Sequence, residues 1–330
     1  MNCRVIIPDT TFVSRHIRII NLISEHSLFT QYMWIILAFV SAFLLGCYEV
    51  NKKFALNNNA VLPILFLNTL ISSAIFVPFI ILSMSTHWLD NTVMYVPHTS
   101  FETQFAVFIK AIIVLSSWIF GYFGMKHLPL TITGPLKATQ PVLTLVGALI
   151  IFGERLNLDQ WIGVILSIAS FYMLASSGKK EGIRFSHNKW IFFTVMSIIT
   201  GALSGLYDKH LMGHLDVMTV QVWFNVYQCL LMIPILLFFW FPHRKNSTPF
   251  VWNWNIVLIS VFLCLADWIY FYALTYPDSM ISVVSMVRRS NVVVTFAAGA
   301  IFFHEKNLKS KAVDLFLVLL GMIFLYLGTN

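Results

Sequence analysis

Three basic side chains, Lys137, Arg288 and Arg289, stand deep inside apolar stretches of this sequence. Lys137 and Arg288 each lie about nine residues into an apolar run, which is about 13 Å along a helix and close to the middle of a bilayer. A basic residue at that depth costs about 2.5–3.5 kcal/mol on insertion scales, so it needs either a partner or a water-filled cavity. These positions therefore predict a site for an anionic group, such as a phosphate or a carboxylate.

Acidic residues that could neutralise these cations are few. Asp267 lies inside an apolar run, whereas Glu49 lies near the end of the first one. Because one acid does not neutralise three cations, we predict an anionic substrate that binds near the membrane midplane. Asp267 and Glu49 would then be counter-ions or proton-coupling groups. The alternative is a structural network of salt bridges between these two acids and the basic residues.

The segment around Lys137 contains two prolines, Pro135 two residues before it and Pro141 four residues after it. Each proline removes a backbone donor, so we expect the helix to bend or unwind there. Transporters place binding sites at such broken helices near the midplane. Lys110 differs, because it lies about two turns into its run, where a long side chain can extend to the interface.

Other polar residues recur at helical spacing within the apolar runs. Asn225 and Gln228 are three residues apart and share one helix face, and Asn68 lies on another run. Hydrogen bonding between helices explains such residues as readily as substrate contact does. We include these three as candidates for substrate binding, and Tyr48 and Lys52 as candidates for the rim of a cavity.

The composition excludes an ordinary soluble domain, because 58% of the residues are hydrophobic and only 11% are charged. The net charge of +7 is no sign of nucleic-acid binding, since Lys and Arg flank the apolar runs. No enzyme motif is present: His304 and Glu305 do not begin a HExxH motif, because Leu308 stands in place of the second histidine. The cysteines show no metal-binding spacing. We expect no catalytic residue, metal or cofactor.

Apolar runs bounded by charged residues, proline and glycine predict an all-α polytopic membrane protein with ten transmembrane helices. The two halves resemble each other, because a shift of 156 positions places Lys53 on Lys209 and a shift of 151 places Lys137 on Arg288. Each half has five helices, an odd number, so the repeats must be inverted, as in transporters that work by alternating access. The expected spans are 33–51, 61–83, 104–124, 128–152, 158–177, 190–207, 217–241, 255–275, 279–303 and 311–328.

We expect three parts: a tail at 1–32, a first five-helix repeat at 33–177 and a second at 178–330. The tail is either an amphipathic interfacial segment or lies upstream of a true start at Met33. Lys and Arg concentrate in the loops after odd-numbered spans, which favours a cytoplasmic location for those loops. The expected partners are a small-molecule substrate and the lipid bilayer, with no nucleic acid, and the protein is expected to be a monomer or a homodimer.

The segment GPLKATQPVLTLVGALIIFGERLNLDQWIGVILSIASFYMLA (134–175) resembles the second part of an EamA domain of the drug/metabolite transporter superfamily. The resemblance rests on a proline within a helix, on a helix of small residues that ends at Gly153-Glu154, and on an uninterrupted final apolar span. SVVSMVRRSNVVVTFAAGAIFFHEK (282–306) resembles the same element repeated, so the resemblance covers residues 33–330. The resemblance implies a carrier. Members of that superfamily are usually drawn with both termini in the cytoplasm, whereas the charge bias of the loops places both termini outside.

Within that superfamily, the basic residues resemble those of the triose-phosphate and nucleotide-sugar translocator branch. Lys137 and Pro141 match its KxxxP-like motif, and Arg288-Arg289 stands where the branch has a Lys-Arg pair that binds substrate phosphate. The resemblance implies a secondary transporter of a phosphorylated or carboxylated metabolite in a bacterial inner membrane. The alternatives are a flippase for lipid-linked phosphates, and a scaffold without transport activity.

Overall fold

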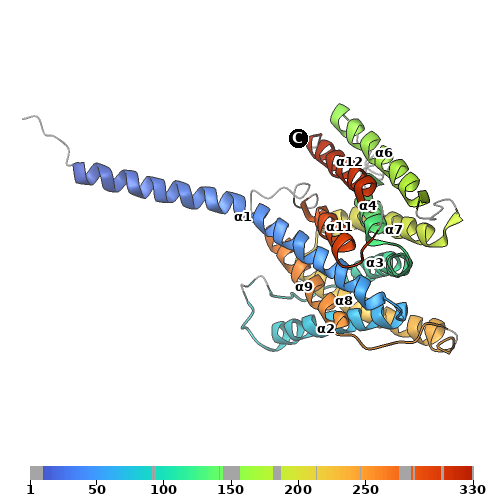
Figure 1. The fold of residues 1–330 in the computed structure, drawn as a ribbon. Coiled ribbons are helices and arrows are strands. Elements are labelled where there is room, and N and C mark those ends of the chain that lie inside the picture. Colours follow the sequence, from blue (N-terminus) through green and yellow to red (C-terminus); the bar gives the residue numbers. More distant parts are fainter. Residues whose placement is uncertain are drawn as a thin grey trace, which may run out of the picture.

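The computed structural model describes residues 10–90, 92, 94–140, 142–143, 157–180, 187–212, 214–245, 247–274, 284, 287–305 and 308–328 (Figure 1). Every regular element within these ranges is a helix, and they contain no strand. The all-helical character expected from the sequence is therefore confirmed for the described part of the chain.

The helices of the first half are separated by short turns and one longer loop. Ser100 caps α3, since its side chain accepts a hydrogen bond from the backbone N–H of Thr103. Pro129 precedes α4 and sets its entry angle. The elements are α1 (Thr10–Leu56), α2 (Val61–Ser85), α3 (Phe101–His127), α4 (Leu130–Ala138) and α6 (Leu158–Lys180).

The helices of the second half follow the same order. Asp216 caps α8, because its carboxylate accepts a hydrogen bond of 3.0 Å from the backbone N–H of Thr219. Beyond Pro234, α8 continues as a short π-helix. The elements are α7 (Lys189–Met212), α8 (Val217–Ile235), η2 (Leu236–Trp240), α9 (Asn255–Leu274), α11 (Asn291–Ile301) and α12 (Leu308–Leu327).

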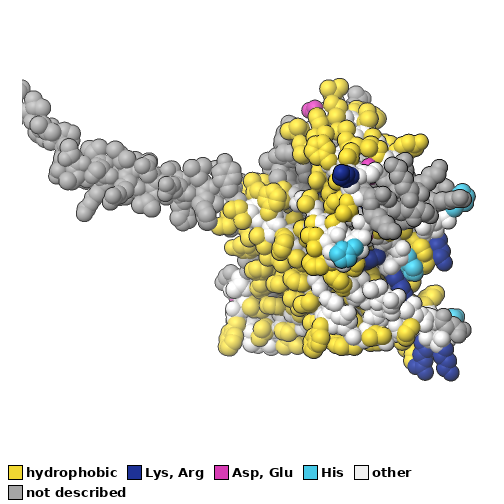
Figure 2. Space-filling view, viewed as in Figure 1, with side chains coloured by type: hydrophobic (Ala, Val, Ile, Leu, Met, Phe, Trp, Pro, Cys, Tyr) yellow, Lys and Arg dark blue, Asp and Glu magenta, His cyan; other side chains and the backbone are white. Residues whose placement is uncertain are grey.

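Five helices in the described part are long and apolar enough to cross a membrane. The number of ten spans remains a prediction. Large apolar side chains such as Phe39, Phe43 and Phe238 are exposed on these helices. Hydrophobic side chains also cover much of the face seen in Figure 2, which is the surface that lipid tails require. The five spans are Met33–Leu56, Val61–Ser85, Phe101–His127, Lys189–Asp208 and Val217–Trp240.

The helix pairs are related by exchange of the two halves. In the repeat assignment, α1 corresponds to α7, α2 to α8, α3 to α9 and α6 to α12. The most extensive pairings are α1 with α9, α6 with α12, and α3 with α7, followed by α2 with α8. Exchange of the halves turns the α1–α9 pair into the α7–α3 pair, and it maps the α2–α8 and α6–α12 pairs onto themselves. Figure 1 shows α6 beside α12 and α2 beside α8, at opposite ends of the bundle.

Candidate functional site

Both central basic positions lie where a helix is interrupted. The helix α4 ends at Ala138, one residue after Lys137. In the second half, Arg288 and Arg289 are helical, the chain turns at Ser290, and α11 begins at the next residue. Positions related by the shift of 151, such as Lys137 and Arg288, are called matched positions below.

Matched residues form the two interruptions in the same way. Thr139 donates its backbone N–H to the carbonyl of Leu136 (3.1 Å), and Ser290 donates its own to the carbonyl of Val287 (3.0 Å). The hydroxyls of Thr139 and Ser290 donate to the same carbonyls, at 2.7 and 2.6 Å. These hydrogen bonds join residues three apart and take the place of the regular α-helical bonds between residues four apart, so the backbone is more tightly wound there.

Prolines do not account for both interruptions. Pro135 lies inside α4, and Pro141 falls outside the described residues. The second half has no proline near Ser290, yet its backbone turns at the matched position. The shared hydroxyl of Thr139 and Ser290 is therefore the better explanation, and the sequence analysis did not use it.

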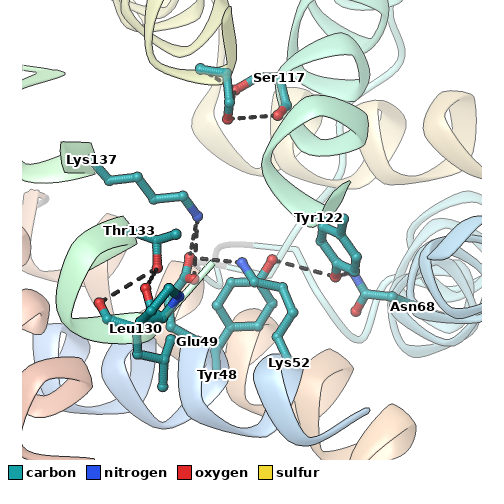
Figure 3. Close-up of polar contacts among 11 residues, drawn as sticks. Tyr48, Glu49, Lys52, Asn68, Ser117, Tyr122, Leu130, Thr133 and Lys137 are labelled. Atoms are coloured by element: carbon teal, nitrogen blue, oxygen red, sulfur yellow. Dashed lines mark hydrogen bonds and ion pairs between the residues drawn. The ribbon is translucent and has the colours of Figure 1, made fainter. Parts of the chain in front are cut away.

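Glu49 lies between two lysines and contacts both (Figure 3). Its Oε1 atom lies 2.8 Å from Lys52 Nζ, and both of its carboxylate oxygens lie 3.3 Å from Lys137 Nζ. The side chain of Lys52 is 3% exposed, whereas that of Lys137 is 23% exposed. Lys137 is therefore the more accessible of the two cations that Glu49 contacts.

Two tyrosines fix the position of Lys52. Its ammonium lies 4.3 Å from the ring centre of Tyr48 and 5.0 Å from that of Tyr122. The Tyr122 hydroxyl lies 3.5 Å from the Tyr48 hydroxyl and accepts a hydrogen bond of 3.1 Å from Asn68 Nδ2. Ser260 donates to the side-chain oxygen of Asn68 at 3.0 Å. Tyr48 and Lys52 are thus buried and not on a rim, and Asn68 supports them from α2.

The second basic position has a different partner. Arg288 forms an ion pair with Asp267, and its guanidinium lies 4.3 Å from the ring centre of Tyr270. Arg289 lies close enough to Arg288, Tyr270 and Glu49 to interact with them electrostatically. Within the described part of the chain, Arg289 makes no hydrogen bond or ion pair. Its guanidinium therefore keeps donors that an anion could use.

The sequence analysis placed Glu49 near the end of the first span and left open a network of salt bridges between Glu49, Asp267 and the basic residues, and the structure contains ion pairs of both acids. The helix α1 continues to Leu56, so Glu49 lies about two turns before its end. The two acids are shared among three basic residues of the site: Glu49 contacts Lys52 and Lys137, and Asp267 contacts Arg288. With Arg289, the site keeps a surplus of positive charge.

Two candidates for substrate binding, Asn225 and Gln228, are buried residues of α8. Asn225 donates to the Gln221 carbonyl of its own helix (2.7 Å), and its backbone carbonyl accepts from Ser73 (2.8 Å). Gln228 is fully buried, and neither atom of its side-chain amide has a partner among the described residues. The hydrogen bond from Ser73 to Asn225 joins α2 to α8, and substrate binding by Asn225 and Gln228 stays a prediction.

The sequence analysis expected the side chain of Lys110 to extend to the membrane interface, and its partner in the structure is the last residue of a candidate span. The side chain of Lys110 is 7% exposed, and its ammonium lies 2.6 Å from Asp208 Oδ1 on α7. It also lies 5.3 Å from the ring centre of Phe224. The pair links α3 to α7, and the sequence did not indicate it because Asp208 belongs to a helix distant in sequence.

The start of α4 is held by a carboxylate from the other half of the protein. Glu305 accepts hydrogen bonds from the backbone N–H groups of Leu130 (2.6 Å) and Thr131 (2.9 Å) and from the Thr131 hydroxyl. Lys311, fully buried, donates to the same hydroxyl at 2.8 Å. Negative charge at a helix N-terminus is stabilising, so Glu305 helps to position Lys137 two turns later. The described residues contain no group of three side chains that could hold a metal.

Comparisons with known proteins find a family, a related sequence and a similar fold. Residues 32–176 and 188–327 match the model of the EamA-like transporter family. An uncharacterized transporter from Archaeoglobus fulgidus is 26% identical over 236 residues, which cover 70% of this chain and 80% of that protein. A solved structure described as "Crystal structure of protein" has a TM-score of 0.59 at 12% identity, over 91% of this chain and 99% of that one. At that identity, it shows the fold alone.

Proposed function

The chain belongs to the EamA-like transporter family, and from that premise we propose that it is a secondary transporter of a small anionic metabolite. It is a membrane protein, as its family and its apolar helices indicate. The substrate would carry a phosphate or carboxylate group and would cross a bacterial inner membrane.

The observation that carries this proposal is the matched placement of Lys137 and Arg288. Each lies directly before the point at which its helix is interrupted. Each keeps part of its surface exposed, 23% for the side chain of Lys137 and 18% for that of Arg288. A purely structural ion pair gains most when it is fully enclosed and fully bonded, and neither condition holds here.

The chemistry of the basic residues suits phosphate or carboxylate. A guanidinium presents a planar fork of donors that matches two oxygens of either group, and an ammonium adds a point charge. Arg288 Nε is buried and has no partner in the described part of the chain. Arg288 and Arg289 could therefore bind two oxygens of one anion while Lys137 binds another.

Alternating access would follow from the relation between the halves. We propose ten helices in two inverted repeats, so that exchange of the halves converts one open state into the other. The pairing of α1 with α9 and of α3 with α7 supports this arrangement. The interruptions at Thr139 and Ser290 are the points where the backbone could change direction with least loss of hydrogen bonds.

The proposal is tested by thermal stabilisation of the purified protein and by uptake into proteoliposomes. The ligands should be matched sets of phosphorylated, carboxylated and cationic metabolites. We expect stabilisation and uptake with members of the anionic sets only. Stabilisation by hydrophobic cations alone would contradict the anionic substrate, and no response to any ligand would favour a scaffold without transport activity.

A further inference from the structure

We propose that the Glu49 carboxylate occupies the anion site when no substrate is bound. When the substrate binds, Glu49 releases Lys137 to it and stays bound to Lys52. The inference rests on the proposed function and adds to it the residue with which the substrate competes. It also assigns a role to Lys52, as the cation that holds Glu49 when the substrate is bound.

The two contacts of Glu49 are unequal in length. The bond to Lys52 is 2.8 Å, which is the usual length of a strong charge-assisted hydrogen bond, whereas both contacts to Lys137 are 3.3 Å. The longer contacts are made to the lysine whose side chain is more exposed. An incoming anion therefore meets the weaker contact first.

Release of Lys137 does not leave Glu49 without a counter-charge. A buried carboxylate without a partner is strongly unfavourable, so a single pair of Glu49 and Lys137 would resist separation. Lys52 removes this obstacle, because it is held against the rings of Tyr48 and Tyr122 and does not need to move. Because Glu49 contacts two cations, it can release Lys137 to an external anion and keep its bond to Lys52.

The acid that competes for the basic residue, Glu49, has no counterpart at the matched position of the other half. In the 156-position shift, Glu49 corresponds to Gly205, which carries no charge. The acid that contacts Arg288 is Asp267 from α9, and its matched residue in the first half is Ser116. The competing acid at Lys137 is thus not a consequence of the internal repeat, and its removal leaves the ion pair of Arg288 with Asp267 in place.

The test uses the full-length protein and inorganic phosphate as the probe. Thermal stabilisation is measured against phosphate concentration, with sodium chloride added to equal ionic strength, for the wild type, Glu49→Gln and Asp208→Asn. If Glu49 occupies Lys137 about nine-tenths of the time, its removal lowers the phosphate concentration for half-maximal stabilisation about tenfold. Asp208→Asn is the matched control, because it removes a carboxylate from Lys110 at a different place in the fold.

Lys52→Met gives the opposite expectation. Without Lys52, Glu49 has only Lys137, so more phosphate should be needed for the same stabilisation. If Lys52→Met does not fold, the double variant Lys52→Met/Glu49→Gln removes both members of the pair. It should fold and bind phosphate about as tightly as Glu49→Gln.

The outcomes separate this inference from the proposed function. Equal phosphate dependence in the wild type and Glu49→Gln would overturn the role of Glu49 and leave the anion site intact. An equal gain in Asp208→Asn would show a general effect of charge and would also overturn it. If phosphate and the anionic metabolites stabilise neither the wild type nor Glu49→Gln, the anionic substrate itself is wrong.

Discussion

The carboxylate of Glu305 accepts a hydrogen bond of 2.6 Å from the backbone N–H of Leu130, so the second half of the protein caps a helix of the first. The capped helix, α4, carries Lys137 near its other end. Because α4 has only nine residues, its direction depends strongly on how its first turn is held. Glu305 therefore links the packing between the halves to the position of the basic residue.

Glu305→Ala should lower the stability of the protein by about 1–3 kcal/mol, since it leaves the buried backbone donors of Leu130 and Thr131 without their charged acceptor. The measurement is the thermal midpoint in detergent. Glu102→Ala is the control, because Glu102 lies in the first turn of α3 but is exposed. A variant of Glu305 as stable as the control would show that the cap is unimportant.

Thr139→Val and Ser290→Ala should each weaken phosphate binding and reduce stability by about 0.5–1.5 kcal/mol, because each removes one side-chain hydrogen bond that shapes the interruption. Phosphate-dependent thermal stabilisation reports both effects. The control is Thr133→Val within α4, where the hydroxyl makes only long contacts of 3.2 and 3.5 Å. An equal loss of phosphate binding in the control would contradict a special role for the interruptions.

An experimental structure should show the two halves superposing after a half-turn about an axis in the membrane plane, with Lys137 on Arg288. The expectation follows from the equal hydrogen bonds at Thr139 and Ser290 and from the paired helices. The measurement is the depth of the two basic residues along the membrane normal. Clearly different depths would contradict the repeat assignment on which the site depends.

The features that could be predicted from the sequence are those that depend on local pattern. Apolar runs predicted the all-helical character of the described residues, and the 151-position shift relates Lys137 to Arg288 from the sequence alone. The family assignment is likewise confirmed. These features depend on residue type and spacing along the chain, which the sequence contains directly.

The contacts of the site could not be predicted, because they depend on which helices become neighbours. Helical spacing places Asn225 and Gln228 on one face, but it does not show that this face meets α2. Likewise, the contact between Glu49 on α1 and Lys137 on α4 joins residues far apart in sequence, which spacing along the chain does not show. Tyr122 and Tyr270 were missed for the same reason, since tyrosine in an apolar run carries no signal of its own.

Alanine substitutions at the two matched cations should have unequal effects on stability. Lys137→Ala removes two long contacts from Glu49, which keeps Lys52, so the loss should be about 1 kcal/mol. Arg288→Ala leaves Asp267 without its ion-pair partner, and the loss should be larger but below the roughly 3–5 kcal/mol of a fully buried pair, because both side chains are partly exposed. Both variants should lose anion-dependent stabilisation and transport.

The double variant Arg288→Ala/Asp267→Asn tests why Arg288→Ala should lose more stability than Lys137→Ala. Neutralising Asp267 should restore most of the stability that Arg288→Ala loses, while phosphate binding and transport stay absent, because the cation for the substrate is still missing. Thermal midpoints and uptake are measured together on the three variants and the wild type. If the double variant regains transport as well as stability, Arg288 serves the fold and does not bind the substrate.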